Sequence, residues 1–221
     1  MKHFFLIFFL SFISFFTYSQ NPLTTSDSEN QKKWVDSIYN SMSLNEKVGQ
    51  LFMVDVFSKD PVKKTNLIDS LIKNYHIGGI IFSKGGPLRQ AKLNNQFQNN
   101  SKIPLMIAMD AEWGLAMRLD STQAFPWMMT LGAIQNHDLI FDIAKDIGRQ
   151  CHQLGIHMNF SPVVDVNNNP KNPIIDRRSF GSDPMNVSSK SLSYNFCPDA
   201  VFCTYTSYPP CLDHPDLAIK C

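Results

Sequence analysis

Two carboxylates and an indole follow directly on an apolar run near the middle of this 221-residue chain. Residues 104–109 (PLMIAM) are apolar, and Asp110, Glu112 and Trp113 come immediately after them. An apolar run without polar residues at alternate positions is typical of a strand that is covered on both faces. In barrels of alternating strands and helices, the chemistry takes place where such strands end. The spacing therefore predicts a buried strand that delivers an acidic cluster to a cleft.

Three further apolar segments end in polar residues and predict three more strands, at residues 50–57, 78–83 and 157–166. Between them, residues 61–75 and 138–154 carry apolar side chains three or four positions apart, which is the period of an amphipathic helix. Pro87 suits a first helical turn, so a further helix is expected over residues 88–99. Strands that alternate with such helices predict an α/β fold with parallel strands.

Ser43 and Glu46 have the spacing of a capping box. In this motif the serine hydroxyl and the glutamate carboxylate each accept a hydrogen bond from the other residue's backbone N–H. The pair predicts the start of a short helical segment that leads into the first strand.

The formal net charge is only +1 over the whole chain. The length leaves room for one domain, and the charge provides no basic excess for binding nucleic acid. Charge alone therefore selects no partner.

Residues 1–19 have the pattern of a secretory signal peptide: a basic start, an apolar centre over residues 4–16 and a small-residue exit. Cleavage is expected after Ser19. The alternative is an uncleaved anchor, although the apolar run is shorter than the about 20 residues that span a bilayer. We expect an exported protein, periplasmic or secreted, with no stable membrane span after cleavage. Residues 20–30, rich in Ser, Thr and Asn, predict a flexible lead into the domain.

The composition changes from Ser188 onward. Four of the five cysteines fall in residues 188–221, at Cys197, Cys203, Cys211 and Cys221. One interpretation is a disulfide-stapled or metal-binding tail, which export would permit. The other is a tail that is disordered or out of frame after Val187. A shifted reading frame would make the chain a truncated form of a longer protein. We expect the ordered domain to cover residues 31–187.

Several motifs occur together and in a fixed order, namely residues 43–51 (SLNEKVGQL), 110–118 (DAEWGLAMR), 125–126 (FP), 131–132 (LG), 155–166 (GIHMNFSPVVDV), 169–170 (NP) and 178–181 (RSFG). On these motifs, residues 31–187 resemble the amino-terminal domain of family 3 glycoside hydrolases, in the β-N-acetylglucosaminidase branch. The family fold is a (β/α)8 TIM-type barrel. The resemblance implies that this chain holds about the first half of such a barrel.

By this resemblance, Asp110 corresponds to the aspartate that grips hydroxyls of the non-reducing terminal sugar, which makes the family exo-acting. A carboxylate can accept from two neighbouring hydroxyls at once. The alternative is a strand-end carboxylate that caps the next turn. Arg178 corresponds to the arginine that reaches the sugar, whereas Arg177 is expected to face solvent. For Arg118, sugar contact and an ion pair with Asp110 or Glu112 are equally good interpretations.

Trp113 departs from the family pattern, because many members have Glu-Gly-Gly where this chain has Glu-Trp-Gly, and this leaves the role of Glu112 open as well. Both are candidate substrate-binding residues, and Trp113 could stack on a sugar or pack. Asp165 corresponds to a carboxylate that supports the floor of the pocket. A metal site from these acids and His157 is not expected, because His157 begins its predicted strand rather than ending it. We expect no metal and no other cofactor.

The resemblance also implies a retaining mechanism, which needs a nucleophilic carboxylate and a proton donor about 5 Å apart. The family's nucleophile lies on a later strand and its proton donor on a histidine loop, and both are expected beyond Val187. We therefore assign no catalytic residue and expect the chain alone to be inactive. The complete protein is expected to hydrolyse O-glycosyl bonds of N-acetylglucosamine-containing glycans or peptidoglycan fragments. The alternatives are a β-glucosidase of the same family and a non-catalytic sugar-binding fragment.

Overall fold

The computed structural model describes residues 28–195, in two compact units that divide after Ser41. The described part of the first unit is helix α2 (Ser28–Ser41), which carries i,i+4 ion pairs and no buried residue. Because α2 begins at Ser28, the prediction of a flexible lead reaching residue 30 was wrong at its last residues. Residues 1–27, with the expected signal peptide and its cleavage site, lie outside the described residues.

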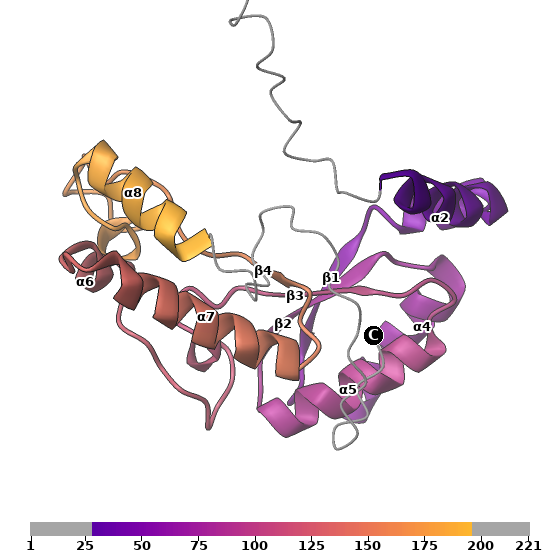
Figure 1. Cartoon of the computed structure of the whole chain (residues 1–221). Coiled ribbons are helices and arrows are strands. Elements are labelled where there is room, and N and C mark those ends of the chain that lie inside the picture. Colours follow the sequence, from indigo (N-terminus) through magenta and orange to yellow (C-terminus); the bar gives the residue numbers. More distant parts are fainter. Residues whose placement is uncertain (1–27, 196–221) are drawn as a thin grey trace, which may run out of the picture. The chain divides into compact units, whose positions relative to one another are not determined.

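The second unit is built on a four-stranded parallel sheet in the order β1-β2-β3-β4 (Figure 1). Its strands are β1 (Met53–Phe57), β2 (Gly79–Lys84), β3 (Met106–Met109) and β4 (Met158–Asn159). Consecutive strands are neighbours and run parallel, so each is connected by a crossover that contains a helix. The predicted α/β fold with parallel strands is confirmed.

The helices of this unit are α3 (Leu44–Gly49), α4 (Val62–Tyr75), α5 (Pro87–Asn100), α6 (Met128–Gly132), α7 (His137–Gln153) and α8 (Pro184–Asn195), with 3-10 turns η1 (Leu115–Met117) and η2 (Asp176–Arg178). The helices predicted over 61–75, 88–99 and 138–154 are thus α4, α5 and α7. The capping box of α3 is also confirmed. Ser43 N donates to Glu46 Oε2 at 2.7 Å, and Glu46 N donates to Ser43 Oγ at 3.3 Å.

The core lies between the sheet and its helices. Successive strand residues point to opposite faces, and the helix-facing positions Ile80, Phe82 and Ile107 are each 0% exposed. Removing such apolar surface from water supplies most of the stability of an α/β layer. On the opposite face of the sheet, the Met53 side chain is 37% exposed. The Asp55 carboxylate, on the same face, accepts a hydrogen bond from Ser83 Oγ.

The strand predicted over residues 157–166 is much shorter than expected. Only Met158 and Asn159 pair with β3, and Phe160 N adds one bond to Met109 O at 2.9 Å. Pro162 has no N–H to continue the ladder, so the chain leaves the sheet and runs as a loop.

The expected end of order at Val187 was also wrong. Helix α8 continues to Asn195, and Val187, Lys190 and Tyr194 are buried at 2%, 2% and 0% exposure. The helix lies against α7 (Figure 1). The serine-rich sequence has low helix propensity, but burial against a neighbouring helix outweighs propensity. Residues 196–221, with the four remaining cysteines, lie outside the described residues.

Among residues 28–195, no helix is long and apolar enough to cross a bilayer.

Candidate functional site

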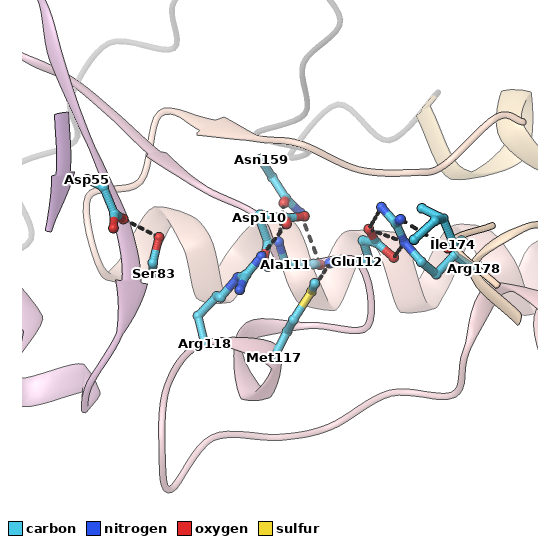
Figure 2. Close-up of polar contacts among 10 residues, drawn as sticks. All are labelled: Asp55, Ser83, Asp110, Ala111, Glu112, Met117, Arg118, Asn159, Ile174 and Arg178. Atoms are coloured by element: carbon cyan, nitrogen blue, oxygen red, sulfur yellow. Dashed lines mark hydrogen bonds and ion pairs between the residues drawn. The ribbon is translucent and has the colours of Figure 1, made fainter. Parts of the chain in front are cut away.

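Asp110 is the first residue after β3 and is paired with Arg118 (Figure 2). Arg118 Nε donates to the Asp110 backbone oxygen at 2.9 Å, and Nη2 donates to Asp110 Oδ2. Of the two interpretations of Arg118, the ion pair with Asp110 is confirmed. The two side chains remain 25% and 26% exposed. Within residues 28–195, no hydrogen bond ends on Asp110 Oδ1, so this oxygen can accept from a ligand.

The backbone of Arg118 is fixed by the end of β2. Gly85 N donates to Arg118 O at 3.1 Å, and Asp120 N donates to Gly85 O at 2.8 Å. Gly85 has φ +145°, and a Cβ there would lie 1.8 Å from Ser58 Oγ. Only glycine therefore fits where the ends of β1 and β2 meet the Arg118 loop. Sequence reasoning missed this contact, although a glycine pair directly after an apolar strand is a signal of close backbone approach.

Glu112 forms the second ion pair, with Arg178 (Figure 2). Arg178 Nε lies 2.9 Å and 3.0 Å from the two carboxylate oxygens, and Nη2 donates to Oε1 at 2.6 Å. Because Glu112 is only 2% exposed, its charge requires such a partner. The hydrogen bonds that Arg178 donates to Glu112 raise the pKa of Arg178, and the charges of Glu112, Asp110 and Asp165 add to this rise.

The geometry of this pair occupies both oxygens of Glu112 and leaves part of Arg178 open. Nη1 of Arg178 donates to Ile174 O at 3.2 Å, and the arginine side chain is 36% exposed. Arg178 pairs with Glu112, and Glu112 lies two residues after Asp110 at the carboxyl end of β3, so both ion pairs lie at the same end of the sheet. Arg178 is thus linked through Glu112 to the segment that begins at Asp110, and the joint role of Asp110 and Arg178 toward one sugar stays a prediction.

Asn159, at the end of β4, fixes the segment between the two acids. It is 0% exposed; its Oδ1 accepts from Ala111 N at 2.9 Å and its Nδ2 donates to Ala111 O at 3.4 Å (Figure 2). A side-chain amide that pairs with both groups of one residue acts as a short extension of the sheet. Sequence reasoning missed Asn159, whose signal was a single amide within the apolar segment MNF.

Trp113 packs on another indole. The ring centroids of Trp113 and Trp127 are 3.9 Å apart at an interplanar angle of 40°, and Arg177 Cζ lies 4.0 Å from the Trp127 centroid. The sequence left open whether Trp113 stacks on a sugar or packs within the protein, and the structure shows packing on Trp127. Arg177 is exposed, as expected, but it rests on an aromatic face rather than standing free in solvent.

Asp165 is exposed, and within residues 28–195 a hydrogen bond reaches its backbone oxygen but none reaches its carboxylate. Ser179 Oγ donates to Asp165 O at 2.5 Å, which ties the 160–170 loop to the segment that follows Arg178. The carboxylate acts on Arg178 through its charge.

His157 precedes β4 and thus lies at the amino end of the sheet, opposite the two ion pairs. Its Nδ1 accepts from Ile107 N at 3.1 Å, and burial together with the nearby His152 lowers its pKa. Among residues 28–195, no three His, Cys, Asp or Glu side chains are grouped so that they could hold a metal ion.

The fold and the site define an α/β protein of the barrel type, with two carboxylate–guanidinium pairs at the carboxyl ends of its parallel strands. A family model described as the glycosyl hydrolase family 3 N-terminal domain matches residues 43–195. The chain belongs to this family, and the match reaches the end of α8 rather than stopping at Val187.

Named relatives and solved structures share this domain. Beta-hexosaminidase A of Pseudoalteromonas piscicida is 34% identical in an alignment of 190 residues that covers 80% of this chain and 31% of that protein. A beta-N-acetylglucosaminidase/beta-glucosidase of Cellulomonas fimi is 30% identical over 161 residues, 73% of this chain and 28% of its own.

A solved family 3 beta-N-acetylglucosaminidase from Paenibacillus sp. str. FPU-7 is 34% identical with a TM-score of 0.63, and the match covers 70% of this chain and 30% of that one. The chain thus spans about 30% of the length of each of these three proteins.

Proposed function

We propose that this chain provides the terminal-sugar site of an exo-acting β-N-acetylglucosaminidase. The observation that carries the proposal is the pairing of Asp110 with Arg118, which leaves one carboxylate oxygen without a donor among residues 28–195, while Glu112, two residues further on, holds the Arg178 guanidinium. A carboxylate with an open oxygen beside rigid N–H donors suits the adjacent hydroxyls of a pyranose. The names of the relatives support N-acetylglucosamine as the sugar.

Each side chain has a distinct task in this proposal. Arg118 holds Asp110 Oδ2, so that Oδ1 is turned toward a sugar hydroxyl. Glu112 is buried and orients Arg178, whose remaining N–H groups donate to sugar oxygens. Trp113 and Asp165 border the site, Trp113 by packing beside Glu112 and Asp165 by its charge. The proposal concerns recognition, and we assign the bond-breaking groups to no residue of this chain.

A β-glucoside is the second candidate substrate. The Cellulomonas relative is named for both activities. The hydroxyl contacts proposed for Asp110 are common to glucose and N-acetylglucosamine, so these contacts alone do not separate the two sugars.

Export is part of the same proposal. The signal-peptide pattern of residues 1–19 supports it. Mass spectrometry of the mature protein is expected to find Gln20 at the amino terminus, and recovery of intact Met1 from the exported fraction would refute cleavage.

Calorimetric titration of the full chain with N-acetylglucosamine, and with glucose in parallel, tests the binding site. Asp110→Asn is expected to weaken binding at least about tenfold, because a charge-assisted hydrogen bond contributes about 1.5–3 kcal/mol. Asp146→Asn is the matched control, because Asp146 is an exposed carboxylate on α7 paired with Arg149. Equal binding by the wild type and Asp110→Asn would show that the sugar does not use this carboxylate.

A further inference from the structure

Beside the Glu112–Arg178 pair lies a stack of three planar groups, formed by Trp113, Trp127 and Arg177. The distances of 3.9 Å to the Trp113 centroid and 4.0 Å to Arg177 Cζ are both measured from Trp127. Trp127 is therefore in contact with both the Trp113 indole, which is tilted by 40° against it, and the Arg177 guanidinium.

The stack is fixed to the proposed sugar site through the chain itself. Glu112 and Trp113 are consecutive, and so are Arg177 and Arg178, which both belong to η2. Consecutive side chains of a 3-10 turn diverge by about a third of a turn. One arginine therefore reaches Glu112 while its neighbour reaches Trp127, which immediately precedes α6. Helix α6 itself is in contact with η2.

The N–H donors of Arg177 make no hydrogen bond to any of residues 28–195. Stacking uses the flat face of the group, whereas all five N–H donors lie in its plane and point outward. Arg177 is exposed, and no acceptor among residues 28–195 receives a hydrogen bond from it, its chain neighbour Asp176 included. By contrast, the charge of Arg178 is matched by Glu112.

We infer that Arg177 binds a carboxylate on the saccharide unit that is linked to the terminal sugar. The inference rests on the proposed function of Asp110 and Arg178, because it places the second unit next to the ring that they hold. A planar guanidinium with an open edge matches a carboxylate through two parallel hydrogen bonds. The indole beneath fixes the orientation of Arg177 before a ligand arrives, which lowers the entropy lost on binding.

The test compares two disaccharides with the same terminal sugar in titrations of the full chain. One is N-acetylglucosaminyl-β-1,4-glucuronic acid, which carries a carboxylate on the second unit, and the other is neutral N,N′-diacetylchitobiose. The wild type is expected to bind the acidic disaccharide about three- to tenfold more tightly. Arg177→Gln is expected to remove this preference and to leave the affinity for the neutral disaccharide unchanged. Arg149→Gln, an exposed arginine on α7, is the matched control and should keep the preference.

The outcomes separate this inference from the proposed function. Equal affinity of the wild type for the two disaccharides, or an Arg177→Gln variant that keeps the preference, would overturn the role of Arg177. N-Acetylglucosamine binding that depends on Asp110 would leave the proposed function standing in both cases. Loss of affinity for both disaccharides in Arg177→Gln would also overturn the inference, because it would indicate that Arg177 acts on the whole site. Circular dichroism melts check that both variants are folded.

Discussion

Replacing Glu112 by glutamine tests whether a buried charge organises the site. The carboxylate is 2% exposed and binds Arg178 through three contacts of 2.6–3.0 Å. Breaking a fully buried ion pair costs about 3–5 kcal/mol. Arg178 is 36% exposed, however, so water can solvate the guanidinium once its partner is neutral. The amide also keeps one oxygen that can accept from Arg178.

We therefore expect Glu112→Gln to lower the free energy of unfolding by about 1–3 kcal/mol. Urea unfolding followed by tryptophan fluorescence measures this change, because Trp113 and Trp127 lie beside the pair. Asp146→Asn breaks an exposed helical pair and should cost less than about 1 kcal/mol. The same titration with N-acetylglucosamine should show weaker binding by Glu112→Gln. Unchanged stability and unchanged affinity would together refute the orienting role of Glu112.

Two further predictions concern the sheet ends. Gly85→Ala should destabilise the protein by more than about 2 kcal/mol and weaken sugar binding. The reason is that Gly85 has a φ of +145° and that the new Cβ would lie 1.8 Å from Ser58 Oγ. A melting curve that matches the wild type would contradict this prediction. For His157, burial lowers the pKa in the folded state, so the folded protein binds fewer protons than the unfolded chain, whose histidine has a pKa of about 6.5. Stability should therefore fall as the pH drops below about 6.5, by at most about 1.4 kcal/mol per pH unit, until the folded-state pKa is reached. A His157→Asn variant should lose this contribution, and identical pH profiles for the two proteins would refute the assignment.

Local periodicity predicted most of the fold. The three- and four-residue spacing in 61–75 and 138–154 is the spacing that a helix needs to cover a sheet, and both segments are helices. Failures occurred where tertiary contacts outweigh local pattern. Residues 188–195 have few apolar positions, yet Tyr194 is fully buried and lies 3.2 Å from Ser161 Oγ. Nothing in the serine-rich sequence itself indicates that partner.

The sequence predicted which residues belong to the candidate site better than it predicted which of them form ion pairs. An aspartate directly after an apolar strand identified Asp110, and the ion pair with Arg118 was one of two open interpretations. The pairing of Glu112 with Arg178 could not be deduced, because it joins residues that are 66 positions apart in the sequence. The contact between Glu112 and Arg178 depends on the path of the chain after β4, and the local spacing of residues does not predict that path.

The contact between segments 112–113 and 177–178 has a consequence for folding. It joins residues that are 66 positions apart in the sequence, which costs loop-closure entropy. The proposed sugar site therefore exists only where these distant segments are packed together, and the unfolded chain does not have it. Any saccharide that binds there therefore stabilises the native state in proportion to the logarithm of its concentration above the dissociation constant. A rise in the melting temperature on adding sugar would show that the sugar binds the native state, in which segments 112–113 and 177–178 are in contact.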